Sequence, residues 1–202
     1  MTLTEAENIM KKSAAYTGVR KLFGWLEAAT FEIKLEGGRT VHMQAQLPHE
    51  EDHYVVVMVD ADRFVELWRQ PLSSHRDVAL NTPETWPKDY KYADAVDGFA
   101  QGVENPVPLA QVSCWRSPCD VVEYKTCFRF FKRKVIVGRA GDPCLSFVNG
   151  ITRTIYLLSN GARSFPVLCE RPAADLLVEL AGLERITPIV LSTLKTAREA
   201  KG

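Results

Sequence analysis

Alternating apolar and polar residues predict a β-hairpin in the first quarter of the chain. One alternating run covers residues 31–35 and another covers residues 41–47, with Gly37-Gly38 between them. A period of two around a glycine turn is typical of two antiparallel strands. The apolar run from His53 to Val59 predicts a third strand. Asp60 or Asp62 can then cap a helix that continues to Arg69, because both are good N-cap residues.

The remaining pattern alternates between helices and strands. Helices are predicted for residues 5–15 after a capping box, for 90–101 after Asp89, for 172–180 and after Thr187-Pro188, with a short helical turn at 24–29. Strands are predicted for 109–115, and for 124–131 and 135–137 on either side of a basic turn. Residues 70–88 are rich in Pro, Ser, Thr and Asn, which is typical of a loop or linker. We therefore predict an α+β fold with a small N-terminal α/β unit (1–72), a linker (73–88) and a second unit (89–202), which can also pack as one domain.

A glycine turn between a buried strand and a helix is the most informative motif. The apolar run Cys144–Val148 ends at Asn149-Gly150, and a helical run follows until Asn160-Gly161. Glycine permits a positive φ, and the first turn of a helix presents free N–H groups and a positive dipole end. Arg153 lies in that first turn. The motif therefore predicts an anion site suited to a nucleotide phosphate, although an ordinary strand-to-helix connection explains it equally well.

Charge is balanced overall but unevenly distributed. The 202 residues carry 25 Lys and Arg and 25 Asp and Glu, and 46% are hydrophobic. Residues 1–100 contain 11 cations and 16 acids, whereas residues 101–202 contain 14 and 9. Two surfaces of opposite charge are one interpretation, and chance is the other. No apolar run approaches the roughly 20 residues of a membrane span, no secretory signal is visible, and the five cysteines are odd in number. We expect a cytoplasmic protein with reduced thiols and no membrane insertion.

Two further motifs have alternative explanations. His49-Glu50-Glu51-Asp52-His53 matches a zinc pattern by letters, but Pro48 and the following valines predict a loop, so we expect no metal site there. The run 128–134 interleaves phenylalanines with Arg129, Lys132, Arg133 and Lys134. These four cations can contact nucleic acid or a partner. The favoured alternative is a hairpin whose phenylalanines enter the core while its lysines cover the turn.

Segments 105–110 (NPVPLA) and 147–153 (FVNGITR) together resemble the ParB/sulfiredoxin superfamily. With Gly98-Phe99-Ala100 and the stretch 150–167 (GITRTIYLLSNGARSFPV), the chain more closely resembles the Osa-like plasmid fertility inhibition factors. The resemblance covers roughly residues 85–185. It implies a ParB/sulfiredoxin-like second unit, with a mixed sheet and flanking helices.

The resemblance also implies a set of site residues. Gly150 and Arg153 fall on the superfamily's nucleotide-phosphate glycine and arginine, and the candidate phosphate residues are Asn149, Gly150, Thr152, Arg153 and Thr154. Ile151 and Thr152 stand where sulfiredoxins have their catalytic cysteine and the histidine beside it. Since isoleucine has no nucleophile, we expect no sulfiredoxin activity.

Two main functions follow from these expectations. The resemblance implies an inhibitor that suppresses conjugative transfer of a co-resident plasmid by binding the coupling-protein ATPase of the type IV secretion apparatus. Such an inhibitor requires no cofactor. The alternative is a nucleotide hydrolase or DNA nuclease that uses the turn, a nucleotide with a divalent metal, and acids near it in sequence, namely Glu104, Glu123 and Asp142. A DNA-binding regulator that uses the basic run is a third hypothesis.

Overall fold

The computed structural model describes residues 15–47, 53–127, 131–184 and 186–194. Residues 5–14 of the helix predicted for residues 5–15 lie outside the described residues, and so do residues 49–52 of the zinc-like pattern. Arg129 lies outside them too, with the neighbouring Phe128 and Phe130 that were expected to enter the core. Among the helices that the structure describes, none is long and apolar enough to span a membrane.

The predicted hairpin forms and belongs to a four-stranded sheet. Strands β2 (Leu26–Lys34) and β3 (Thr40–Gln46) pair antiparallel, and the sheet order is β1-β2-β3-β5. Strand β1 (Tyr16–Leu22) pairs with β2, and β5 (Val107–Pro108) pairs in parallel with β3. Phe31 lies opposite Met43 and both are fully buried, so the alternating apolar residues face the core.

The predicted helical turn at 24–29 is wrong, because β2 already begins at Leu26 and only residues 23–25 form a turn. Ala28 and Ala29 are completely buried within this strand. Burial against neighbouring strands outweighs the low strand propensity of alanine here.

A second, five-stranded sheet has the order β11-β4-β10-β6-β9. Its strands are β4 (Tyr54–Asp60), β6 (Ala110–Arg116), β9 (Pro143–Asn149), β10 (Ser164–Glu170) and β11 (Ile189–Val190). Strand β10 runs antiparallel to β4 and parallel to β6, so the sheet is mixed, as predicted. The predicted last helix after Thr187-Pro188 is wrong at its start, since β11 pairs with β4 there.

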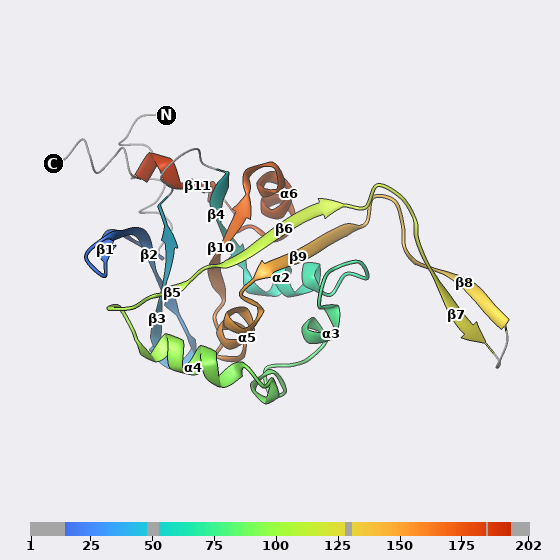
Figure 1. Ribbon diagram of the computed structural model, residues 1–202, viewed down its shortest axis with the longest axis horizontal. Coiled ribbons are helices and arrows are strands. Elements are labelled where there is room, and N and C mark those ends of the chain that lie inside the picture. The colour runs from blue at the N-terminus through green and yellow to red at the C-terminus, as the bar shows by residue number, and fades with distance from the viewer. Residues whose placement is uncertain (1–14, 48–52, 128–130, 185, 195–202) are drawn as a thin grey trace.

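Helices lie around the two larger sheets (Figure 1). They are α2 (Ala61–Trp68), α3 (Arg76–Ala79), α4 (Tyr92–Ala100), α5 (Ile151–Ser159) and α6 (Arg171–Ala181). Asp60 caps α2 by accepting a hydrogen bond from the Arg63 N–H at 3.0 Å, as predicted. The buried Phe64 of α2 packs edge-on against Phe165 of β10, with ring centroids 5.4 Å apart. This contact fixes α2 against the sheet.

The segment predicted as a linker is packed into the protein. It contains α3 and a 3₁₀ turn, η2 (Trp86–Lys88), and the side chains of Ala79 and Trp86 are buried. Each of the two larger sheets contains strands from before and after the 73–88 segment, since β4 pairs with β10 and β3 pairs with β5. The segment therefore does not divide the strands into one sheet before it and one after it. Whether each predicted unit folds on its own stays a prediction.

The third sheet is a two-stranded ribbon that extends away from the rest of the molecule (Figure 1). Its strands are β7 (Val121–Cys127) and β8 (Phe131–Gly138), and we call this ribbon the arm. The basic turn predicted between the two strands is wrong in position. Lys132, Arg133 and Lys134 lie within β8, opposite Thr126, Lys125 and Tyr124 respectively.

Candidate functional site

The strand-to-helix turn forms where the sequence predicts it. Strand β9 ends at Asn149 and α5 begins at Ile151, with Gly150 between them at φ 91°. A Cβ atom at Gly150 would lie 2.6 Å from the Ala110 Cα atom of β6. Only glycine fits, because both the positive φ and the close approach of two backbones exclude a side chain.

Arg153 is engaged by the protein itself. Its guanidinium donates hydrogen bonds to the Pro108 and Leu109 carbonyl oxygens, the latter at 3.2 Å. It also donates to the Asn149 Oδ1 atom at 2.9 Å. Burial lowers the pKa of Arg153, although a guanidinium stays charged in any protein at ordinary pH. The side chain thereby connects α5 to the β5–β6 junction.

The other candidate phosphate residues lie at the same turn. The Thr154 Oγ1 atom donates to the Gly150 carbonyl oxygen at 3.1 Å, and Thr154 is fully buried. The structure thus brings Asn149, Gly150, Thr152, Arg153 and Thr154 together, as the sequence requires. Because the hydrogen bonds of Arg153 and Thr154 go to protein oxygens, these contacts account for the turn structurally, and phosphate binding stays a prediction.

The three candidate carboxylates lie in separate places. The Glu104 Oε1 atom lies 3.9 Å from the Arg20 Nη2 atom of β1, and Glu123 lies in β7 of the arm. Asp142 precedes β9, whereas the turn follows it, so these two features lie at opposite ends of one strand. Asp142 accepts a hydrogen bond from the Arg139 N–H at 2.8 Å and so stabilises a loop. Sequence proximity alone suggested these acids, and the fold does not assemble them at the turn.

The arm presents cations rather than burying its strands. Lys125, Lys132, Arg133 and Lys134 are all exposed. The favoured expectation placed the lysines on a turn, but they occupy positions along a strand. The sequence did not single out the exposed residues Tyr124 and Ile136. Tyr124 stood only as the start of the predicted strand 124–131, and Ile136 only as the middle of the predicted strand 135–137.

The base of the arm is held by hydrogen bonds between its two connections. The Ser117 N–H donates to the Asp142 carbonyl oxygen at 2.9 Å, and the Gly141 N–H donates to the Ser117 carbonyl oxygen at 2.8 Å. Asp120 accepts from the Ala140 N–H at 2.8 Å. These bonds bring the entering and leaving chains together, so the arm begins from a defined point.

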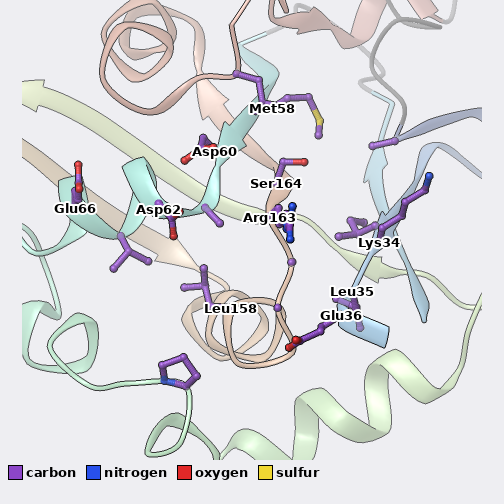
Figure 2. A pocket seen from close by; sticks show the side chains of 18 of the residues that line it. Lys34, Leu35, Glu36, Met58, Asp60, Asp62, Glu66, Leu158, Arg163 and Ser164 are labelled. Atoms are coloured by element: carbon purple, nitrogen blue, oxygen red, sulfur yellow. The ribbon is translucent and has the colours of Figure 1, made fainter. Parts of the chain in front are cut away.

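A groove of about 1410 Å³ lies between the first sheet and α2 (Figure 2). Charged residues of both signs line it: Glu32, Lys34, Glu36, Asp60, Asp62, Glu66, Arg69 and Arg163. Some already have partners, since Asp60 caps α2 and Arg69 donates to the Ala79 carbonyl oxygen at 2.8 Å. No motif could have indicated this groove, because its walls come from segments far apart in sequence.

Comparison with known proteins places this architecture in a family. The family model described as "Plasmid Fertility inhibition factor" matches residues 56–182, well over half of the chain. The chain belongs to the plasmid fertility inhibition factor family. The matched range includes the turn and the arm, whereas strands β1, β2 and β3 precede it.

Two relatives of this fertility inhibition factor agree with the assignment. Protein osa of Shigella flexneri is 29% identical over 141 residues, which cover 69% of this chain and 61% of that protein's own length. The crystal structure of the oncogenic suppression activity protein, a plasmid fertility inhibition factor in its gold(I) cyanide derivative, matches with a TM-score of 0.64. That match has 22% identity and covers 98% of this chain and 93% of the other. It confirms the predicted α+β fold class.

Proposed function

We propose that this fertility inhibition factor suppresses conjugative transfer of a co-resident plasmid from the cytosol of the donor cell. It does so by binding the coupling-protein ATPase of the type IV secretion apparatus. Family membership supports the biological process, and the family resemblance of the sequence suggested the target. Inhibition by binding requires an accessible surface rather than a complete catalytic site.

The contacts of Arg153 are the observation that favours a binding protein over a nucleotide hydrolase or nuclease. A phosphate-transfer site needs cations directed at the phosphate and an acid-held metal or an oriented water. Here the Arg153 guanidinium donates to the Leu109 carbonyl oxygen and to Asn149. The three candidate acids are dispersed over a loop, the arm and the far end of β9. This arrangement favours a structural turn in a binding protein.

Two measurements test the proposal. Purified protein is expected to bind purified coupling protein in a pull-down and in a titration that gives a dissociation constant. Expression in donor cells is expected to lower the mating frequency of a second conjugative plasmid. The proposal fails if the protein neither binds the coupling protein nor lowers the mating frequency.

A further inference from the structure

The two faces of the arm differ in chemistry. Residues opposite one another in an antiparallel pair point to the same face, and successive residues alternate between faces. The register therefore gives the arm a Tyr124 face and a Lys125 face. The Tyr124 face consists of three opposed pairs, Val122 with Ile136, Tyr124 with Lys134 and Thr126 with Lys132. The Lys125 face includes the pairs Glu123 with Val135 and Lys125 with Arg133.

The Tyr124 face combines an apolar patch with two ammonium groups. Tyr124 is 65% exposed and Ile136 is 52% exposed, which is unusual for large apolar side chains within a sheet. Lys134 and Lys132 follow them toward the distal end and are exposed. An apolar area bordered by cations is therefore presented on one side of the ribbon.

The arm has little of its own to stabilise it. An isolated two-stranded ribbon is marginal in water unless another surface covers one face. The arm extends away from the two larger sheets (Figure 1). A described contact with the body lies at its base, where Gly138 packs against Leu72. A partner that covered the Tyr124 face would remove its apolar groups from water and stabilise the ribbon.

Charge decides what kind of partner fits this face. A second copy packed face to face would set the lysines of two arms against one another, which is repulsive. Duplex DNA would be contacted through phosphates, and strong phosphate binding is typical of basic domains, whereas this protein has a net charge of 0. An apolar pocket rimmed by carboxylates matches both parts of the face, because tyrosine is favoured at the centre of protein interfaces and charges at the rim.

We propose that the Tyr124 face of the arm is the docking surface of this protein, and that its partner is an acidic protein surface with an apolar pocket that receives Tyr124. This inference rests on the proposed function, which states that a protein is bound, and adds the surface and the chemistry of recognition. Lys132 and Lys134 pair with carboxylates of the partner. Ile136 and Val122 cover the wall of the pocket.

Two matched charge reversals on the full chain test the face. Lys132→Glu with Lys134→Glu alters the Tyr124 face, and Lys125→Glu with Arg133→Glu alters the Lys125 face by the same net charge. The first pair and Tyr124→Ala are each expected to weaken coupling-protein binding by about 30-fold, which is the size of an interface hot spot. The second pair is expected to weaken it by less than about 3-fold. Mating inhibition is expected to follow the same order, and thermal melting of all three variants is expected to match the wild type.

The outcomes separate this inference from the proposed function. If the wild type binds the coupling protein and both charge pairs have equal effects, the docking face is wrong and the proposed function stands. If the wild type does not bind it, yet only the Tyr124-face variants relieve mating inhibition, the face stands and the target falls. If the wild type binds a 30-base-pair DNA duplex and both pairs abolish that binding equally, the partner is a polyanion and the inference is overturned.

Discussion

The β2–β3 hairpin and the arm are both two antiparallel strands, yet they occupy opposite environments. In the β2–β3 hairpin, Phe31 and Met43 are fully buried, and the end of the hairpin is attached to α5. The Glu36 N–H donates to the Asn160 carbonyl oxygen at 3.0 Å, and Arg39 donates to Asn160 Oδ1 at 2.7 Å. The arm instead exposes cations on both faces. One hairpin is part of the core, whereas the other is free to meet a partner.

The comparison implies different energetic roles for the two hairpins. Burial of apolar side chains drives the folding of the β2–β3 hairpin together with the rest of the molecule. The described side chains of the arm include few buried apolar groups, so residues such as Tyr124 and Lys134 can change with little effect on folding. Binding and stability are therefore expected to separate by hairpin.

The largest expected effect compares one aromatic side chain from each hairpin. Phe31→Ala removes a fully buried ring and is expected to lower the free energy of unfolding by about 3–5 kcal/mol. Tyr124→Ala is expected to change it by less than about 0.5 kcal/mol, since the ring is mostly exposed. Urea unfolding followed by circular dichroism measures both. A large loss for Tyr124→Ala would show that the arm is part of the folded core.

The next effect concerns the attachment of the hairpin to α5. Gly161 has φ 73°, and a Cβ atom there would lie 2.7 Å from Glu36 Cβ. Gly38 has φ 77° with open space around it. Both alanine variants share the left-handed backbone cost, so Gly161→Ala is expected to be less stable than Gly38→Ala by about 1–3 kcal/mol because of overpacking.

Equal unfolding midpoints and equal slopes for these two variants would contradict the attachment. Hydrogen exchange offers a second measurement. The Glu36 amide donates to the Asn160 carbonyl oxygen, so it is expected to exchange faster in Gly161→Ala than in Gly38→Ala.

Arg153 connects α5 with β5. Helix α5 contacts the end of the β2–β3 hairpin, and β5 is a strand of the same sheet as that hairpin. Arg153→Ala is expected to lower the free energy of unfolding by about 1–2 kcal/mol, because carbonyl acceptors lose a charged donor. Arg153→Lys is expected to lose less, although an ammonium cannot span the same acceptors. Mating inhibition per folded molecule is expected to stay unchanged. Lost inhibition in a stable Arg153→Lys variant would instead favour phosphate chemistry at the turn.

The smallest expected effect is a difference in thiol labelling between the cysteines of the five-stranded sheet and Cys119 at the base of the arm. Burial raises the pKa of Cys114 and of Cys169 to about 12, and burial also raises the pKa of Cys144. Cys119, which precedes the arm, is exposed. In a Cys127→Ser background at pH 8, a thiol reagent is expected to label Cys119 rapidly and the buried thiols only on unfolding.

The same thiols predict a loss of stability at alkaline pH. Their folded pKa lies above the unfolded value of about 8.5, so the unfolded chain releases protons first as the pH rises. Their contribution is therefore fully present below about pH 8 and declines from about pH 9 toward pH 12. Urea unfolding of wild type and of Cys114→Ser across this pH range measures the decline. If the free energy of unfolding changes equally with pH in the two proteins, the prediction is contradicted.

The two hairpins also show what sequence patterns can predict. The β2–β3 hairpin was predicted correctly, because one buried face imposes a period of two on residues 31–47. Among the described side chains of the arm, no continuous face is buried, so the pattern did not indicate the register, and the charged residues 132–134 resembled a turn. Ile189 and Val190 form a strand because β4 offers a free edge, which local propensity cannot reveal.

The candidate site divides in the same way. The glycine turn was predictable, since its requirement for a positive φ is local. The partners of Arg153 were not, because Pro108 and Leu109 lie more than forty residues earlier in the chain. The carboxylates Glu104, Glu123 and Asp142 were chosen by distance in sequence, and the fold separates them.

The hydrogen-bonded base of the arm has a consequence for how such proteins can diversify. Because Ser117 and Asp142 already hold the two connections together, the chain beyond them closes a loop whose ends are fixed. Lengthening such a loop costs little, about 0.6 kcal/mol for each doubling. The arm can therefore be shortened, extended or replaced while the two larger sheets stay unaltered. A new binding specificity could then arise through replacement of one insertion.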